Sequence, residues 1–128
     1  MGASILVVGL DEVLAAELRR ALADLGHTVA VEGFRSAVDC LAAIARAGAE
    51  LVFCGTDPRQ YGALLQSLQR GSQDTPVVVV SRLPETGDWL DAMEAGAWDY
   101  CAAPFEPDLI GRIVENTLKC PRTLPLAS

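Results

Sequence analysis

Short apolar runs alternate along the whole chain with longer segments that have helical periodicity. The runs are continuous or β-branched, as expected for strands of a buried parallel sheet, and they lie at residues 4–10, 27–33, 50–54, 75–81 and 97–103. Between them apolar residues recur every three or four positions, which indicates amphipathic helices. These segments lie at residues 11–25, 35–47, 59–70, 86–95 and 106–118. The alternation predicts an α/β domain with a parallel sheet.

Glycines and prolines mark the ends of these elements. Gly48 and Gly96 each stand between a helical segment and the next apolar run, and each is expected to cap its helix with the strand following at once. Pro121 and Pro125 cannot continue the last helix. We therefore predict a domain over residues 1–119, followed by a tail or the start of a linker over residues 120–128.

Composition narrows the class of protein. The 128 residues suit one domain, and 51% hydrophobic residues with 5% aromatics indicate an aliphatic core. The formal net charge of -7 argues against direct nucleic-acid binding, because phosphates need a basic face. No apolar run reaches the length of a membrane span, and the apolar start lacks the basic region of a signal peptide. We expect a cytoplasmic protein with no membrane contact.

Four cysteines occur in the chain, and their spacing matches no zinc pattern. Cys54 and Cys101 lie in predicted strands, and Cys40 lies on the apolar face of a predicted helix. The fourth, Cys120, begins the tail. Buried free thiols are the expected state of such residues in a reducing compartment.

Candidate chemistry should lie where the strands end, because ligands of open parallel sheets bind outside the carboxyl ends of the strands. The residues at those ends are Gly9, Leu10 and Asp11 after the first strand, Gly55, Thr56 and Asp57 after the third, Ser81 and Arg82 after the fourth, and Ala102 and Ala103 after the fifth.

The stretch "GAWDYCAAPFEPDLI" at residues 96–110 carries a family resemblance. It is similar to the G-A-x-D-Y-[LI]-x-K-P-F-x-x-x-x-L ending of response-regulator receiver domains, the CheY-like family. "TPVVVVS" at residues 75–81 is similar to that family's fourth strand, which closes on Thr or Ser. Over residues 4–118 the resemblance implies a flavodoxin-like fold, a doubly wound five-stranded parallel sheet of order 2-1-3-4-5 with five helices. It also implies a role in two-component (phosphorelay) signal transduction.

The resemblance also assigns positions to the family's phosphorylation site. A typical receiver phosphorylates an Asp after its third strand, holds Mg²⁺ with an acidic pair after the first, and contacts the phosphoryl group with a Ser/Thr and a Lys. The matching residues here are Gly55 for the phosphoacceptor, Gly9 and Leu10 for the acidic pair with Asp11 just after it, Ser81 for the Ser/Thr and Ala103 for the Lys.

Most of that chemistry is missing from these residues. Gly55 has no carboxylate to form an acyl phosphate, and Ala103 has no charge to offset a phosphoryl group. Gly9 and Leu10 offer Mg²⁺ no side-chain oxygen. We therefore predict a degenerate receiver, or pseudo-receiver: a non-enzymatic module with no metal or cofactor that acts through protein contacts.

Two other functions stay open. Asp57, two residues past Gly55, could be a relocated phosphoacceptor with Asp11 or Glu12 beside it, although an Asp before Pro58 more often caps the next helix. Alternatively, the emptied pocket could hold a small molecule, with backbone N–H groups at helix starts binding an anion. An inward Asp57 favours the first alternative, a roomy cavity favours the second, and a filled apolar pocket favours the pseudo-receiver.

The resemblance also indicates where partners bind. In this family the face made by the fourth helix, fifth strand and fifth helix, here residues 86–118, contacts output domains or a second copy, so a homodimer stays open. Tyr100 matches an aromatic switch position, or is a half-buried tyrosine with its hydroxyl in water. Trp89 and Trp98 are core residues, or interface residues if exposed beside Tyr100. Phe105 is assigned to the same face.

Overall fold

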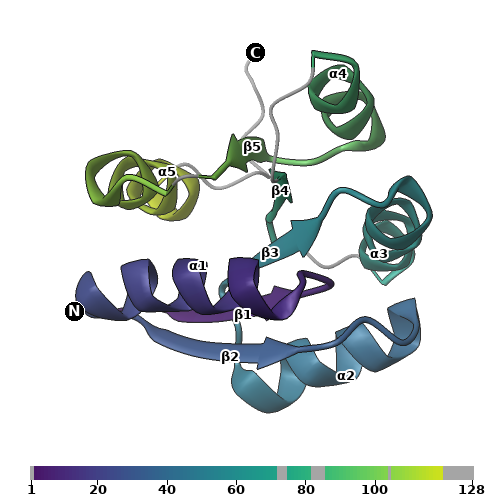
Figure 1. Ribbon diagram of the computed structural model, residues 1–128. Helices are drawn as coiled ribbons and strands as arrows, with labels where there is room; N and C mark the ends of the chain where they lie inside the picture. Colours follow the sequence, from purple (N-terminus) through teal and green to yellow (C-terminus); the bar gives the residue numbers. More distant parts are fainter. Residues whose placement is uncertain (1, 72–74, 82–85, 104, 120–128) are drawn as a thin grey trace.

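The computed structural model describes residues 2–71, 75–81, 86–103 and 105–119, without the side chains of residues 86–89 and 119. Five strands and five helices alternate along the chain (Figure 1). The strands are β1 (Ser4–Val8), β2 (Thr28–Glu32), β3 (Leu51–Gly55), β4 (Val77–Ser81) and β5 (Asp99–Ala102). The helices are α1 (Glu12–Asp24), α2 (Ala37–Ala47), α3 (Pro58–Arg70), α4 (Thr86–Ala95) and α5 (Pro107–Lys119).

All neighbouring strands are parallel, and their order is β2-β1-β3-β4-β5. Helices α1 and α5 pack on one face of the sheet, and α2, α3 and α4 pack on the other (Figure 1). This is the fold class and strand order that the sequence and its resemblance predicted. Strand β2 lies at one edge of the sheet, and none of its residues is fully buried.

The central strands are buried on both faces, which explains their continuous apolar sequence. Along β3 and β4, successive side chains point alternately into the α1/α5 layer and into the α2/α3/α4 layer. Phe53 and Val78 belong to the first layer, and Val52 and Val77 to the second, and all four are 0% exposed. The core therefore forms two halves with the sheet between them.

The register of the sheet brings the strand ends together. Val8 pairs with Cys54, Gly55 with Val80, and Ser81 with Ala102. Residues that follow these pairs thus meet at one edge of the sheet, although they are distant in sequence.

Several predicted boundaries were wrong by one or two residues. β1 ends at Val8 rather than at residue 10, because Gly9 turns the chain with a φ of +73°. Gly48 caps α2 at a φ of +60°, as predicted, but β3 does not follow at once. Ala49 first donates to the Ile44 carbonyl oxygen at 3.0 Å to complete the cap, and β3 then begins at Leu51.

The thiols are as the sequence predicted wherever the structure describes them. Cys40, Cys54 and Cys101 are buried and free, and burial raises the pKa of Cys54 and Cys101 to about 12. Cys120 lies outside the described residues, as does most of the predicted tail. Among the described residues, no helix combines the length and apolar character that crossing a bilayer requires.

Replacing Gly48 by Ala tests the α2 cap. A Cβ at Gly48 would meet no atom within 4 Å, so any cost comes from the left-handed backbone alone. We expect the free energy of unfolding, measured in urea, to fall by about 1 kcal/mol. The control is Gly62→Ala inside α3, where the added Cβ also finds open space. That variant should gain roughly 0.5–1 kcal/mol, and equal losses in both variants would contradict the assignment.

Candidate functional site

Two glycine backbones meet at the centre of the carboxyl edge. Gly55 is the last residue of β3 and is fully buried. A Cβ built on Gly55 would lie 2.5 Å from the Gly9 carbonyl oxygen and 3.3 Å from its carbon. Real Cβ atoms do not approach a backbone oxygen that closely, so any side chain at Gly55 would push the β1–α1 connection aside. The connection can pass over the end of β3 only because residue 55 is a glycine.

Other elements close around Gly9 as well. A Cβ at Gly9 would lie 2.9 Å from Gln60 Oε1 in the first turns of α3 and 3.6 Å from the Phe34 Cβ in the β2–α2 connection. Gly9 also has a positive φ, which glycine adopts without strain. Three segments, from β3, α3 and the β2–α2 connection, thus converge on the Gly9 backbone.

The side chains around this contact are apolar. Leu10, Ala103 and Phe105 are half-buried and pack against the same part of the core, which includes Leu14 of α1 and Ile110 of α5. One Leu10 methyl group would also lie 3.5 Å from a Cβ at Gly55. The resemblance places charged residues of the phosphorylation site at positions 10 and 103, whereas here both side chains extend the core.

The two carboxylates nearest the site cap helices. Asp11 Oδ1 accepts from the Leu14 N–H at 2.8 Å and caps α1. Asp57 Oδ1 accepts from the Arg59 N–H at 3.0 Å, caps α3, and lies 3.5 Å from the Arg59 Nε. Both arrangements satisfy N–H groups that have no partner within the helix. The turn-and-cap interpretation of Asp57 therefore matches the observed geometry.

The residues at this edge do not suit a magnesium ion. Mg²⁺ prefers several hard oxygen ligands in octahedral geometry. Gly9 and Leu10 provide no such side chains, and the Asp11 carboxylate is already engaged at the start of α1. Among the described residues, no group of three Cys, His, Asp or Glu side chains is arranged to hold a metal ion.

Ser81 keeps its place at the end of β4, but it is 5% exposed. Its carbonyl oxygen accepts from the Ala103 N–H at 3.0 Å, which joins the ends of β4 and β5. Thus Gly9, Leu10, Gly55, Ser81 and Ala103 lie at one edge of the sheet, as the sequence predicted.

Tyr100 lies on the edge strand β5 and packs toward the layer of α2, α3 and α4. Its hydroxyl oxygen is buried and has no hydrogen-bond partner among the described residues, so the alternative of a hydroxyl in water is wrong. An unpaired buried hydroxyl costs about 1–3 kcal/mol. Trp98 is half-buried, and its backbone N–H donates to the Val77 carbonyl oxygen at 2.7 Å. The Trp89 side chain lies outside the described residues.

Sequence reasoning missed Phe34 and Gln60, which close over Gly9. Phe34 carried a weak signal, since a lone aromatic in a polar connection often packs inward. Gln60 carried no such signal, because the sequence does not distinguish an exposed glutamine in a first helical turn from one that reaches a neighbouring loop.

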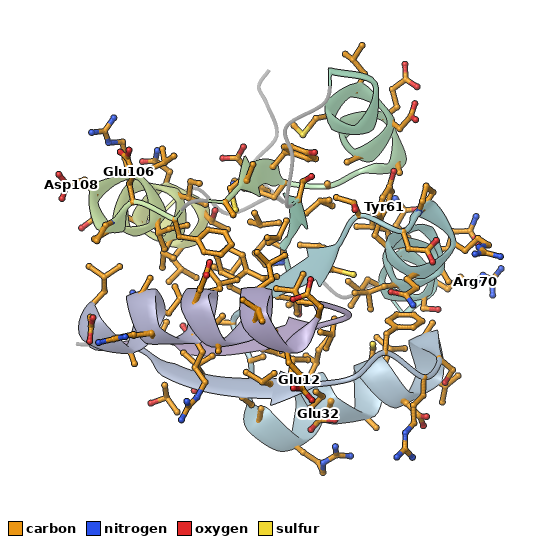
Figure 2. The ribbon with its side chains drawn as sticks, viewed as in Figure 1. Glu12, Glu32, Tyr61, Arg70, Glu106 and Asp108 are labelled. Atoms are coloured by element: carbon orange, nitrogen blue, oxygen red, sulfur yellow. The ribbon has the colours of Figure 1, made fainter. Side chains whose placement is uncertain are left out.

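Figure 2 shows that the acidic side chains Glu12, Glu106 and Asp108 lie near the starts of α1 and α5.

Solved structures resemble this chain over most of its length. The receiver domain of NtrX from Brucella abortus is 31% identical, and the match covers 90% of this chain and 98% of that one with a TM-score of 0.73. A response regulator from Thermotoga maritima is 21% identical, with 94% of this chain and 100% of that one covered and a TM-score of 0.77. This second likeness concerns the fold alone.

The chain matches only part of the longer NtrX structure. That match has 28% identity and a TM-score of 0.78, and it covers 93% of this chain but 28% of the NtrX chain. No protein-family model matches the sequence, and neither does any curated protein.

Substituting Gly55 tests the closed backbone contact. We expect Gly55→Ala to lower the free energy of unfolding by about 1–3 kcal/mol, as overpacking of a filled core does. Gly55→Asp should cost at least as much, because it adds a buried charge. The measurement is urea denaturation, with Gly33→Ala and Gly33→Asp as matched controls at a position where a Cβ meets nothing within 4 Å. Equal stability of the Gly55 and Gly33 variants would contradict the steric argument.

Proposed function

Because the chain belongs to the receiver-domain family of two-component response regulators, we propose that it is a pseudo-receiver that signals through protein contacts without phosphorylation. It has no catalytic role in this proposal. The receiver fold supplies a rigid module, and the surface of that module carries the signal. A cytoplasmic location is part of the same proposal.

One observation carries this proposal: a Cβ at Gly55 would lie 2.5 Å from the Gly9 carbonyl oxygen. The position that the family uses for its phosphoacceptor thus lacks a carboxylate and also lacks space for one. The apolar packing of Leu10 and Ala103 supports the same conclusion, because neither side chain can bind a metal or neutralise a phosphoryl group. An inward Asp57, a roomy cavity and a filled apolar pocket would each favour a different candidate function. The contacts around Gly55 resemble the filled apolar pocket.

The proposed contact surface is the α4–β5–α5 face. β5 is an edge strand, and apolar side chains are exposed on both flanking helices: Leu90 and Met93 on α4 at 46% and 37%, and Leu109 on α5 at 44%. Exposed apolar side chains near a sheet edge suit a protein interface. The partner in this proposal is an output domain, another protein or a second copy of the chain.

Tyr100 gives this face a means of responding to a partner. Its buried hydroxyl finds no hydrogen-bond partner in the part of the chain that the structure describes, so a conformation that provides one would be stabilised. A partner that binds only that conformation would shift the population toward it. Tyr100 and Trp98 therefore remain the proposed switch residues. Phe105 packs inward beside Ala103, so it would contribute by positioning the start of α5.

The relocated phosphoacceptor remains the alternative function. Asp57 is half-buried beside the site, but its Oδ1 already accepts from the Arg59 backbone. Phosphorylation would break that cap, and the position that the resemblance assigns to the lysine is Ala103, which carries no charge to offset a phosphoryl group. The helix-cap role explains Asp57 without further assumptions, which is why we place this function second.

A titration followed by ¹H–¹⁵N NMR tests the proposal. We expect no amide of Gly55, Ser81 or Tyr100 to shift when Mg²⁺ and then beryllofluoride, an acyl-phosphate mimic, are added. Saturable shifts at these amides that disappear in Asp57→Asn would establish the alternative. Asp57→Asn keeps a capping side chain, so its loss of response could not be ascribed to an unfolded α3.

The surface is tested by Leu109→Glu. A charge at a desolvated interface is costly, so we expect this variant to shift the monomer–dimer equilibrium toward the monomer in sedimentation-equilibrium runs. The matched control is Val38→Glu on α2, a residue that is 73% exposed on a different face and should leave the equilibrium unchanged. A wild-type chain that stays monomeric at every concentration would exclude the homodimer.

A further inference from the structure

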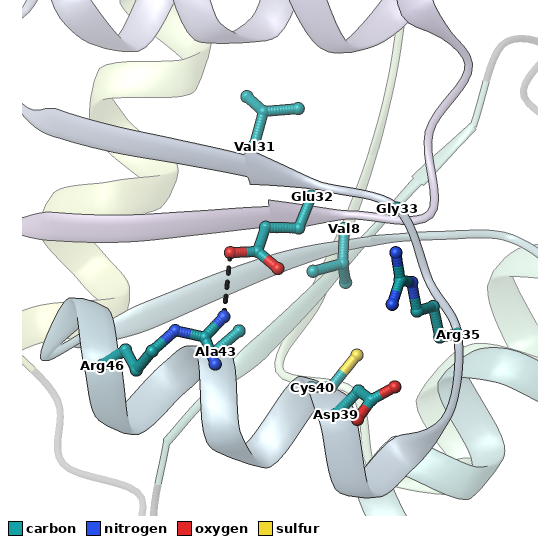
Figure 3. Close-up of a pocket in the computed structure, with 9 residues that line it drawn as sticks. All are labelled: Val8, Val31, Glu32, Gly33, Arg35, Asp39, Cys40, Ala43 and Arg46. Carbon is teal, nitrogen blue, oxygen red and sulfur yellow. Dashed lines mark hydrogen bonds and ion pairs between the residues drawn. The ribbon is translucent and has the colours of Figure 1, made fainter.

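A half-open polar cavity of about 490 Å³ lies near the Gly9–Gly55 contact, between the carboxyl end of β2 and helix α2 (Figure 3). Its volume falls within the usual range of small-molecule sites. Val8, Cys40 and Ala43 line its buried side, and the lining also includes four charged side chains, those of Glu32, Arg35, Asp39 and Arg46. The lining excludes a purely apolar ligand, because binding one would desolvate those charges.

One wall of the cavity is already an ion pair. Arg46 on α2 donates to Glu32 Oε2 at the end of β2 over 3.2 Å (Figure 3). Each group satisfies the other, so this wall has little remaining charge with which to bind a ligand. It joins α2 to the edge strand β2.

The opposite end carries two charges without partners. Arg35 and Asp39 both line the cavity, and neither side chain makes a hydrogen bond or ion pair with any residue that the structure describes. Figure 3 shows the Arg35 guanidinium and the Asp39 carboxylate at the same end of the cavity. A cation and an anion that face one cavity without touching match a ligand that carries both charges.

The floor of the cavity is chemically inert. Burial, followed by the charges of Asp39 and Glu32, raises the pKa of the Cys40 thiol to about 11. The thiol is therefore protonated at neutral pH, and a protonated thiol is a poor nucleophile. A ligand here binds reversibly by charge and hydrogen bonding.

We propose that this cavity binds a small zwitterion of the α-amino-acid type, its carboxylate on Arg35 and its ammonium group on Asp39. A guanidinium binds a carboxylate through two parallel hydrogen bonds, and a carboxylate accepts readily from an ammonium group. A ligand held by these two side chains would leave the Glu32–Arg46 ion pair intact. The proposal does not depend on whether the receiver site is phosphorylated.

The position of the cavity links the ligand to the closed site. Gly33 and Arg35 line the cavity, and Phe34 between them approaches Gly9, with its Cβ 3.6 Å from a Cβ position on that glycine. A ligand that orders Arg35 therefore restrains the segment that packs on the β1–α1 connection. The receiver would then respond to a metabolite bound next to the Gly9–Gly55 contact.

The test is a ¹H–¹⁵N NMR titration of the full chain with L-threonine and L-methionine, which have the same zwitterionic group and different side chains. We expect saturable shifts at Gly33, Arg35 and Asp39, with smaller shifts at Gly9. N-acetyl-L-threonine and L-threonine amide each lack one of the charges and should bind at least about tenfold more weakly. The absence of saturable shifts with both amino acids at millimolar concentration would overturn the proposal.

Variants locate the binding groups. Arg35→Gln and Asp39→Asn should each weaken L-threonine binding by at least about tenfold. The matched controls, Arg19→Gln and Asp24→Asn on α1, lie on the other face of the sheet and should leave binding unchanged. Because an aspartate in a first helical turn also stabilises its helix, unfolding of Asp39→Asn is measured in parallel. Unchanged affinity in a folded Asp39→Asn would overturn the assignment.

Discussion

The approach of the Gly9 carbonyl to Gly55 is the contact on which the carboxyl edge of this domain depends. It lets the β1–α1 connection pass directly over the end of β3. Leu10 then reaches the core beside Ala103 and Phe105, and Asp11 is left at the start of α1 as its cap. A side chain at residue 55 would prevent this arrangement, because backbone atoms cannot move aside as the end of a flexible side chain can. One missing Cβ thus decides the geometry of the whole edge.

The fold does not depend on the chemistry of that edge. Its stability comes from the two aliphatic layers packed on β1, β3 and β4, and none of those buried residues needs a charge at the strand ends. A receiver domain can therefore lose its phosphorylation site and still present the same outer surfaces. This separation of scaffold from site is the physical basis for a pseudo-receiver, whose fold is shared with its relatives while its function depends on particular surface residues.

Polar groups remain next to this apolar edge, in the cavity between β2 and α2. There Glu32 and Arg46 form an ion pair. Arg35 and Asp39 line the same cavity but do not form an ion pair with each other. Phe34 lies between the cavity and Gly9, so the two regions share one connecting segment. The proposed ligand and the proposed protein contacts would therefore act on one rigid module.

The sequence by itself determined the alternation of strands and helices, the burial of the thiols and the positions that meet at the carboxyl edge. The elements and the buried thiols follow from apolar periodicity, which is a local pattern. The positions at the carboxyl edge follow from the strand ends once the topology of the sheet is known. Only the tertiary structure decided that Gly9 and Gly55 touch and that Gln60 and Phe34 close over them. It also decided that the Tyr100 hydroxyl is buried and that Arg35 and Asp39 share a cavity. Such contacts join segments distant in the chain, and their distances depend on how the layers pack, which no local pattern encodes.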